Sequence, residues 1–177
     1  QELVDFSAAG MSDVSEVVVS GPASPAVASL DDLSGKDVFV RKSSSYYESM
    51  VALNEKFAAE QKPPVILKEA PETLEDEDLL EMLNAGILKA IVVDDWKARI
   101  WAQVLPHVKL REDLVLRDDG VTGWAIRKGS PNLEAEIADF YANYTRKQGV
   151  LDYRVAQYQK RIKQIRDNTS DAEAKRF

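Results

Sequence analysis

The sequence contains no cysteine and a single histidine, His107, among its 177 residues. The absence of cysteine excludes disulfide bonds, cysteine-ligated zinc sites and a thiol nucleophile. A single histidine excludes a multi-histidine metal site. No apolar run approaches the roughly 18 residues that a membrane-spanning helix needs. The formal net charge of −7 argues against nucleic acid as a partner.

The short motifs that mark nucleotide-binding or hydrolytic sites are also missing, since the sequence has no GxSxG, P-loop or GxGxxG segment. The acidic run ETLEDEDLLE, at residues 72–81, lacks the spacing and the glycine of a calcium loop. We interpret it as a solvated helix face. We therefore expect neither a metal nor a cofactor, and no residue stands out as catalytic.

Strand-like and helix-like segments alternate through the first two thirds of the chain. Apolar or β-branched runs at residues 16–19, 37–40, 65–67 and 90–93 predict strands. Amphipathic segments begin near residues 45 and 73, and a shorter helix is expected over residues 96–104. Over residues 20–106 this alternation predicts an α/β domain with a mainly parallel sheet and helices on both faces.

The remainder of the chain changes character. Extended segments are expected at residues 114–116 and 123–127, followed by a helix that begins at Ser130-Pro131. A second helix over residues 151–166 carries an apolar stripe that includes Ile162 and Ile165. This basic helix either docks on a neighbour or touches an acidic surface. A further N-cap is predicted at residues 168–170. Since the chain opens at Gln1, we expect a piece of a longer protein.

Three consecutive serines, Ser43 to Ser45, mark the junction between the strand at residues 37–40 and the helix that follows it. Hydroxyls and free N–H groups at a helix start attract a carboxylate or phosphate, because ligands of open α/β sheets bind beyond the carboxyl ends of the strands. An ordinary N-cap is the alternative. Tyr47 falls on the apolar stripe of this helix with Met50, Val51, Phe57 and Ala58. Tyr46 lies off the stripe, so we expect it to face a cleft and to be more exposed than Tyr47.

Asp94 follows the buried strand at residues 90–93 and offers a second polar group at a strand end. Its carboxylate is suited to pairing with an ammonium group. Alternatively, Asp94 or Asp95 caps the helix that starts at Trp96. Trp96 itself either packs in the core or contacts a ligand. An anion-binding helix start and a nearby carboxylate together suit a zwitterion such as a free amino acid.

Three segments resemble family 3 periplasmic solute-binding proteins, the amino-acid binders. SLDDLSGKDVFVRKSSSYYESM resembles their "DLxGKxVxVxxGTS" segment, and LLEMLNAGILKAIVVDD resembles "LxxGxxDAxxxD". GWAIRKGSPNLEAEIADFYANYTRKQGVL is similar to their closing segment with "KGSPxL". Within the family, EVVVSGP, KSSSYYESM and IRDNTSDAEAKRF are most similar to the regulatory module of membrane-bound lytic transglycosylase F.

The resemblance implies a periplasmic-binding-protein type II fold with two α/β lobes. Residues 20–106 would form the complete second lobe. Residues 1–19 would be a first-lobe remnant and a crossing strand, and residues 107–150 the other crossing strand and the return to the first lobe. Residues 151–177 would be a helical linker towards a catalytic domain beyond Phe177. The opening half of the first lobe is expected upstream of Gln1.

The resemblance also assigns roles at the site. Ser44 and Ser45 stand at the positions that hold a ligand α-carboxylate, and Asp94 stands at the position that pairs with the α-amino group. Tyr46 and Trp96 complete the predicted ligand-binding set. Two residues depart from the family pattern. Ser43 replaces a glycine, and Lys89 replaces an aspartate.

The function implied is a periplasmic sensor of an amino acid or a small, muropeptide-like peptide, non-catalytic by itself, within a peptidoglycan lytic transglycosylase. The alternative is the amino-acid-binding receptor of an ABC importer. The expected partners are the ligand and a covalently linked catalytic domain, with no nucleic acid. The parent protein is expected to be periplasmic with a possible outer-membrane attachment, and exposed lobe remnants could form a dimer.

Overall fold

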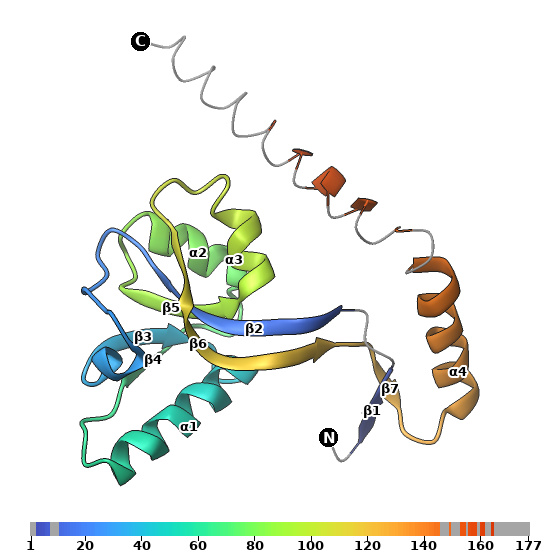
Figure 1. Cartoon of the computed structure of the whole chain (residues 1–177), viewed down its shortest axis with the longest axis horizontal. Helices are drawn as coiled ribbons and strands as arrows, with labels where there is room; N and C mark the ends of the chain where they lie inside the picture. The colour runs from blue at the N-terminus through green and yellow to red at the C-terminus, as the bar shows by residue number, and fades with distance from the viewer. Residues whose placement is uncertain are drawn as a thin grey trace. The chain divides into compact units, whose positions relative to one another are not determined.

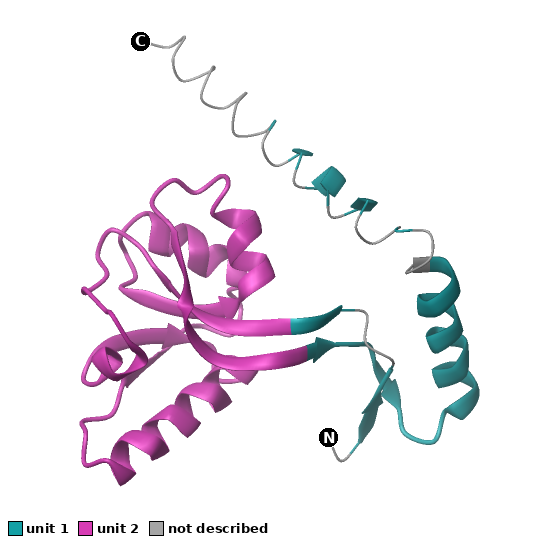
Figure 2. Ribbon diagram, viewed as in Figure 1, with its two compact units in different colours: residues 1–13, 121–177 teal, residues 14–120 magenta. Residues whose placement is uncertain are grey.

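The structure is a computed structural model, and it describes residues 3–7, 11–145, 149, 153–154, 156–158, 160–161 and 164. Ile162, Ile165 and the N-cap predicted at residues 168–170 lie outside the described residues. The chain divides into two compact units, which Figure 2 shows in different colours. Unit 1 comprises residues 1–13 and 121–177, and unit 2 comprises residues 14–120.

A five-stranded mixed sheet forms the centre of unit 2 (Figure 1). The strand order is β4 (Ile66–Glu69), β3 (Asp37–Val40), β5 (Ala90–Asp94), β2 (Met11–Ser20) and β6 (Lys109–Thr122). Strand β3 runs parallel to both β4 and β5, whereas β2 pairs with β5 in the antiparallel sense. The predicted α/β class is confirmed, with a sheet that mixes both strand directions.

Helices cover both faces of this sheet. Helix α1 (Ser45–Ala59) lies on one face, and α2 (Asp76–Asn84) and α3 (Asp95–Trp101) lie on the other (Figure 1). A 3-10 turn, η1 (Leu30–Leu33), precedes β3. Helix α1 ends shortly before residues 63–64, which are both proline, because proline cannot continue a helix. Gly86, at φ +74°, follows α2 in the left-handed conformation that glycine adopts freely.

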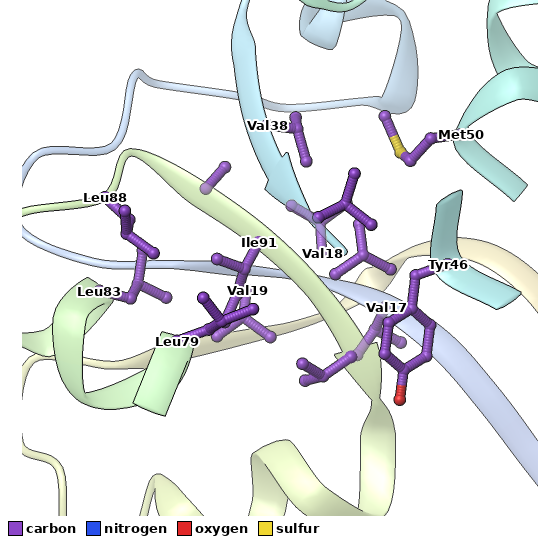
Figure 3. Packing of buried hydrophobic residues seen from close by; sticks show 14 of the residues in the cluster. Val17, Val18, Val19, Val38, Tyr46, Met50, Leu79, Leu83, Leu88 and Ile91 are labelled. Atoms are coloured by element: carbon purple, nitrogen blue, oxygen red, sulfur yellow. The ribbon is translucent and has the colours of Figure 1, made fainter. Parts of the chain in front are cut away.

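The core of unit 2 lies between the sheet and these helices (Figure 3). Strand β5 is buried on both faces over residues 90–93, as its continuous apolar run predicts. The buried face of α1 consists of Tyr46, Met50, Leu53 and Phe57. Their spacing of four, three and four residues places them on one side of the helix. This face is rotated from the predicted stripe, since Tyr46 is inside it and Ala58 is exposed.

Strands β2 and β6 approach each other closely at Gly120. A Cβ atom at this position would lie 2.7 Å from the carbonyl oxygen of Val14. Real Cβ atoms essentially never come within 3.0 Å of another heavy atom, so any other residue here would push the two strands apart.

Unit 1 is built from smaller elements. Strand β1 (Val4–Phe6) pairs with β7 (Ala125–Arg127) in an antiparallel, two-stranded sheet. Helix α4 (Pro131–Phe140) follows and continues into a π-helical turn, η2 (Tyr141–Thr145). Aromatic rings contact one another in this unit, and they belong to Trp124, Phe140, Tyr141 and Tyr144. Among the described residues, no helix is long and apolar enough to cross a membrane.

Candidate functional site

The candidate site lies in unit 2, where β3 and β5 end and helices α1 and α3 begin. The two strands are parallel neighbours, with Phe39 paired to Ile91, so their carboxyl ends meet at one edge of the sheet. This is the edge at which open α/β sheets bind ligands, because helix N-termini converge there. The predicted residues Ser44 and Asp94 both stand at this edge, immediately before their helices.

The three serines have three different environments. Ser44 is the N-cap of α1: its Oγ accepts a hydrogen bond from the Tyr47 N–H at 3.3 Å and donates to the carbonyl of Arg41 at 2.7 Å. Ser43 donates its N–H to a carboxylate oxygen of Glu72 at 3.1 Å, and its hydroxyl donates to the other oxygen. The Ser45 side chain is exposed. The capping role weighed for the serines therefore belongs to Ser44.

Tyr46 connects the two strand ends, and the prediction that it is the more exposed tyrosine is wrong. Its side chain is 6% exposed, whereas Tyr47 is half-buried. The Tyr46 hydroxyl accepts the N–H of Asp94 at 3.3 Å and donates to Asp76 Oδ2 at 3.2 Å. Figure 3 shows the hydroxyl on the side of the ring away from Met50. Burial, aided by the charges of Asp76 and Asp94, raises the pKa of Tyr46, so it stays a neutral donor.

Asp76, the first residue of α2, is the most deeply buried charge of the site, at 2% exposure. One carboxylate oxygen accepts from Arg41 Nη2 at 2.7 Å, and the other accepts from Lys97 Nζ at 2.6 Å. The prediction that residues 72–81 form a solvated face therefore fails at Asp76. The reason is that two cations and the Tyr46 hydroxyl replace the water that a buried carboxylate would lose.

Asp94 is less enclosed than Asp76. Its Oδ2 lies 3.8 Å from Lys97 Nζ, and its side chain is 18% exposed. Burial raises the pKa of Asp94, and the charge of Lys97 opposes this shift. Asp94 occupies the N-cap position of α3 without a capping side-chain bond. Asp95 instead accepts the N–H of Ser15 at 3.2 Å and pairs with Arg99 at 2.7 Å. Neither carboxylate caps α3, contrary to the capping alternative.

Trp96 lies beside these charges. Lys97 Nζ lies 5.5 Å from the centre of the Trp96 ring, which is close enough for a cation–π interaction. The indole Nε1 of Trp96 is buried and has no hydrogen-bond partner among the described residues, and the same holds for Arg41 Nε. Trp96 therefore contacts the charged cluster with its ring while one polar atom stays unpaired.

A second buried carboxylate, Glu16 on β2, stands opposite Asp94 in the β2–β5 register. It is 4% exposed and accepts a hydrogen bond from the hydroxyl of Ser49. Arg117 Nη1 lies 3.8 Å from its other oxygen. The candidate site thus has a carboxylate on each of two neighbouring strands, and both are partly neutralised by cations.

Sequence reasoning missed four charged members of the cluster: Arg41, Asp76, Lys97 and Glu16. Arg41 directly follows the predicted strand at residues 37–40, and Lys97 lies three residues after Asp94, so strand ends and helical spacing could have suggested both. Asp76 is hidden among neighbouring acids, and no local signal distinguishes it. Among the described residues, no group of three or more metal-ligating side chains is close enough to hold a metal ion.

Comparisons with known proteins place the fold among solute-binding proteins. No protein-family model and no curated protein matches the chain. An ancestral arginine-binding protein bound to glutamine matches with 26% identity and a TM-score of 0.63, over 88% of this chain and 63% of that one. A Streptococcus pneumoniae amino acid ABC transporter substrate-binding protein bound to L-arginine matches with 21% identity and a TM-score of 0.66.

The match with the Streptococcus pneumoniae protein covers 91% of this chain and 63% of that protein. A putative L-cystine ABC transporter protein from Listeria monocytogenes matches with 14% identity and a TM-score of 0.68, over 89% and 63%. This chain therefore spans less than two thirds of the length of these solved proteins. These neighbours are named for amino-acid binding, for ABC transporters or for both, and the fold is of the periplasmic-binding-protein type II.

Proposed function

We propose that this chain is a non-catalytic, extracytoplasmic binding module for an amino acid, of the kind that serves an ABC importer. The observation that carries the proposal is that Ser44, Tyr46 and Asp94 lie together at one edge of the sheet. There an N-capped helix start and a partly exposed carboxylate lie on neighbouring strands. The solved neighbours that share the fold are named for arginine, glutamine and cystine, which supports an amino acid as the ligand class.

In this proposal residues 20–106 act as the second lobe of the binding protein. The N–H groups of Ser43 and of the start of α1, together with the hydroxyl of Ser45, hold the ligand carboxylate. Asp94 holds the ligand ammonium, and the ring of Trp96 borders the ligand. Tyr46 does not contact the ligand in this scheme. It positions Asp94 instead, because its buried hydroxyl accepts the Asp94 N–H.

Isothermal titration calorimetry of the 177-residue chain with L-arginine, L-glutamine and L-cystine tests the proposal. We expect at least one of them to bind and Asp94→Asn to weaken that binding by roughly 10- to 100-fold, since a charge-assisted hydrogen bond contributes about 1.5–3 kcal/mol. Asp118→Asn, an exposed change on β6, is the matched control. Equal binding by the two variants would contradict the role of Asp94, and no binding of any amino acid would contradict the function.

A narrower hypothesis makes this module the regulatory part of a peptidoglycan lytic transglycosylase. Its support is the sequence similarity of KSSSYYESM and of the closing residues IRDNTSDAEAKRF to that regulatory module. The closing residues lie outside the described residues. The solved neighbours favour the importer hypothesis instead, because they are ABC transporter proteins. A competition between L-glutamine and a soluble muramyl peptide separates the two. Preference for the muramyl peptide favours the transglycosylase, and preference for the free amino acid favours the importer.

A further inference from the structure

Glu72 places a carboxylate of the chain itself on the helix start that we propose for the ligand carboxylate. Glu72 is an exposed residue of the segment between β4 and α2, and it lies 29 residues from Ser43 in sequence. One of its oxygens accepts the Ser43 N–H at 3.1 Å, and the other accepts the Ser43 hydroxyl. A carboxylate that binds both groups of a residue beside a helix start makes the contacts expected of an anionic ligand.

Lys97 places an ammonium group of the chain itself beside the residue that we propose for the ligand ammonium. Its ammonium lies 3.8 Å from Asp94, the proposed partner of a ligand ammonium. The chain therefore supplies both an internal anion and an internal cation. These two contacts come from different elements, α3 and the β4–α2 segment.

The two internal charges differ in how firmly they are held. Lys97 donates to the buried Asp76 at 2.6 Å and lies over the ring of Trp96, so two groups besides Asp94 hold it. Glu72 is exposed, and it accepts hydrogen bonds from the Ser43 hydroxyl and from the backbone N–H groups of Ser43 and Lys42. Glu72 is therefore the group that can leave without exposing a buried charge.

We propose that Glu72 is a displaceable internal carboxylate and that the ligand binds by exchanging its own carboxylate for that of Glu72 at Ser43. This inference rests on the proposed function, and it assigns to the site a regulatory contact that sets its affinity. A site that is self-occupied for most of the time binds ligand more weakly, in proportion to the fraction that is open. Self-occupation for nine tenths of the time would weaken binding about 10-fold.

The first experiment tests the internal contact without any ligand. The Ser43 amide proton is followed by nuclear magnetic resonance of the whole chain between pH 3 and pH 7. The hydrogen bonds from Ser43 lower the pKa of Glu72. We expect the Ser43 amide shift to titrate with a midpoint below that of an ordinary glutamate, and Glu72→Gln to abolish the titration. Glu69→Gln, which changes the acid paired with Lys42 at 3.6 Å, is the control and should leave the titration unchanged.

The second experiment measures the affinities of the wild type, Glu72→Ala and Glu69→Ala for L-arginine and for L-argininamide, which lacks the free carboxylate. We expect Glu72→Ala to bind L-arginine several-fold more tightly, up to about 10-fold, with no gain for L-argininamide. Glu69→Ala should match the wild type. L-glutamine replaces L-arginine in this comparison if it is the tighter ligand of the wild type, with L-glutamine amide as its capped analogue.

The outcomes separate the two proposals. A Ser43 amide that does not titrate with Glu72, or equal affinities of the wild type and Glu72→Ala for a ligand that binds, overturns the exchange and leaves the proposed function standing. A gain that L-argininamide shares also overturns it, because the ligand carboxylate is then not involved. Absence of binding by both proteins, with a titrating Ser43, overturns the proposed function and the exchange that rests on it.

Discussion

The two units differ in how completely they bury their apolar side chains. Unit 2 encloses the sheet between helices, and its core includes residues such as Phe57, Leu80 and Ile91, each at 0% exposure. Among the described residues of unit 1, the buried apolar side chains are Ile126 and Ile137. Large apolar residues of unit 1 are instead exposed, for example Trp124 at 54% and Phe140 at 42%.

This difference shows which part of the chain specifies its own structure. Burial of apolar surface is the main favourable term in folding, so unit 2 contains the interactions that stabilise it. A two-stranded sheet is at best marginally stable by itself, and the aromatic rings of unit 1 stack on one another at the surface. The candidate site belongs entirely to the better packed unit, where charged side chains can be held in fixed positions.

The largest expected effect comes from matched truncations in the two units. Phe57→Ala should lower the free energy of unfolding by about 3–5 kcal/mol, because it leaves a cavity in a closed core. Phe140→Ala should lower it by less than about 1 kcal/mol, because the ring is already half in water. Urea unfolding followed by circular dichroism measures both. Similar losses for the two variants would mean that unit 1 is as well packed as unit 2.

A smaller effect is expected from the removal of one phenol oxygen. Tyr46→Phe leaves the Asp94 N–H without its acceptor and removes one of the three donors to Asp76, which should cost about 1–2 kcal/mol. Tyr144→Phe, in the exposed ring stack of unit 1, should cost almost nothing. The same unfolding measurement applies. If Tyr46→Phe is neutral, the hydroxyl does not contribute to holding the site together.

The smallest effect concerns the charge of Asp94. Its pKa is raised in the folded state, so the folded protein holds this proton more tightly than the unfolded chain does. The ionised form therefore destabilises the fold as the pH rises through the ordinary value of 3.8 and then through the raised value. We expect Asp94→Asn to increase the free energy of unfolding at pH 7 and the gain to vanish near pH 3.

The control for this measurement is Asp5→Asn, an exposed change of the same kind on β1 of unit 1, which should alter the free energy of unfolding by less than about 0.5 kcal/mol. Unfolding free energies of the wild type and both variants, measured at pH 7 and at pH 3, decide the question. A loss of stability in Asp94→Asn at pH 7 would mean that the ion pair with Lys97 outweighs the cost of burial.

Strands and helix ends were predictable wherever the signal is local. The β-branched run at Asp37–Val40 and the apolar run at residues 90–93 form the central strands β3 and β5. The helix start after Ser44 follows from its capping chemistry, which acts within four residues. The strand-end rule also placed Ser44 and Asp94 at one edge, because it depends only on parallel neighbours.

The rest depends on tertiary partners that a single sequence does not reveal. The buried face of α1 is fixed by the sheet that it covers, and a rotation by about one residue moves Tyr46 from the surface into the core. Asp76 is buried because Arg41, which follows β3, and Lys97, in α3, reach it from more than 20 residues away on either side. Glu72 engages Ser43 for the same reason, since nothing local to either residue indicates the contact.

The position of Trp96 allows changes at the candidate site to be followed by intrinsic tryptophan fluorescence. Its indole lies within 5.5 Å of the Lys97 ammonium, and Lys97 in turn approaches Asp94. The emission of an indole responds to a nearby charge, so any event that moves Lys97 will change the fluorescence of Trp96. Trp101, at the end of α3, and the exposed Trp124 of unit 1 add to the total emission. The protein thus carries its own optical reporter at the sheet edge, and Trp101→Phe combined with Trp124→Phe leaves Trp96 as the single source of indole emission.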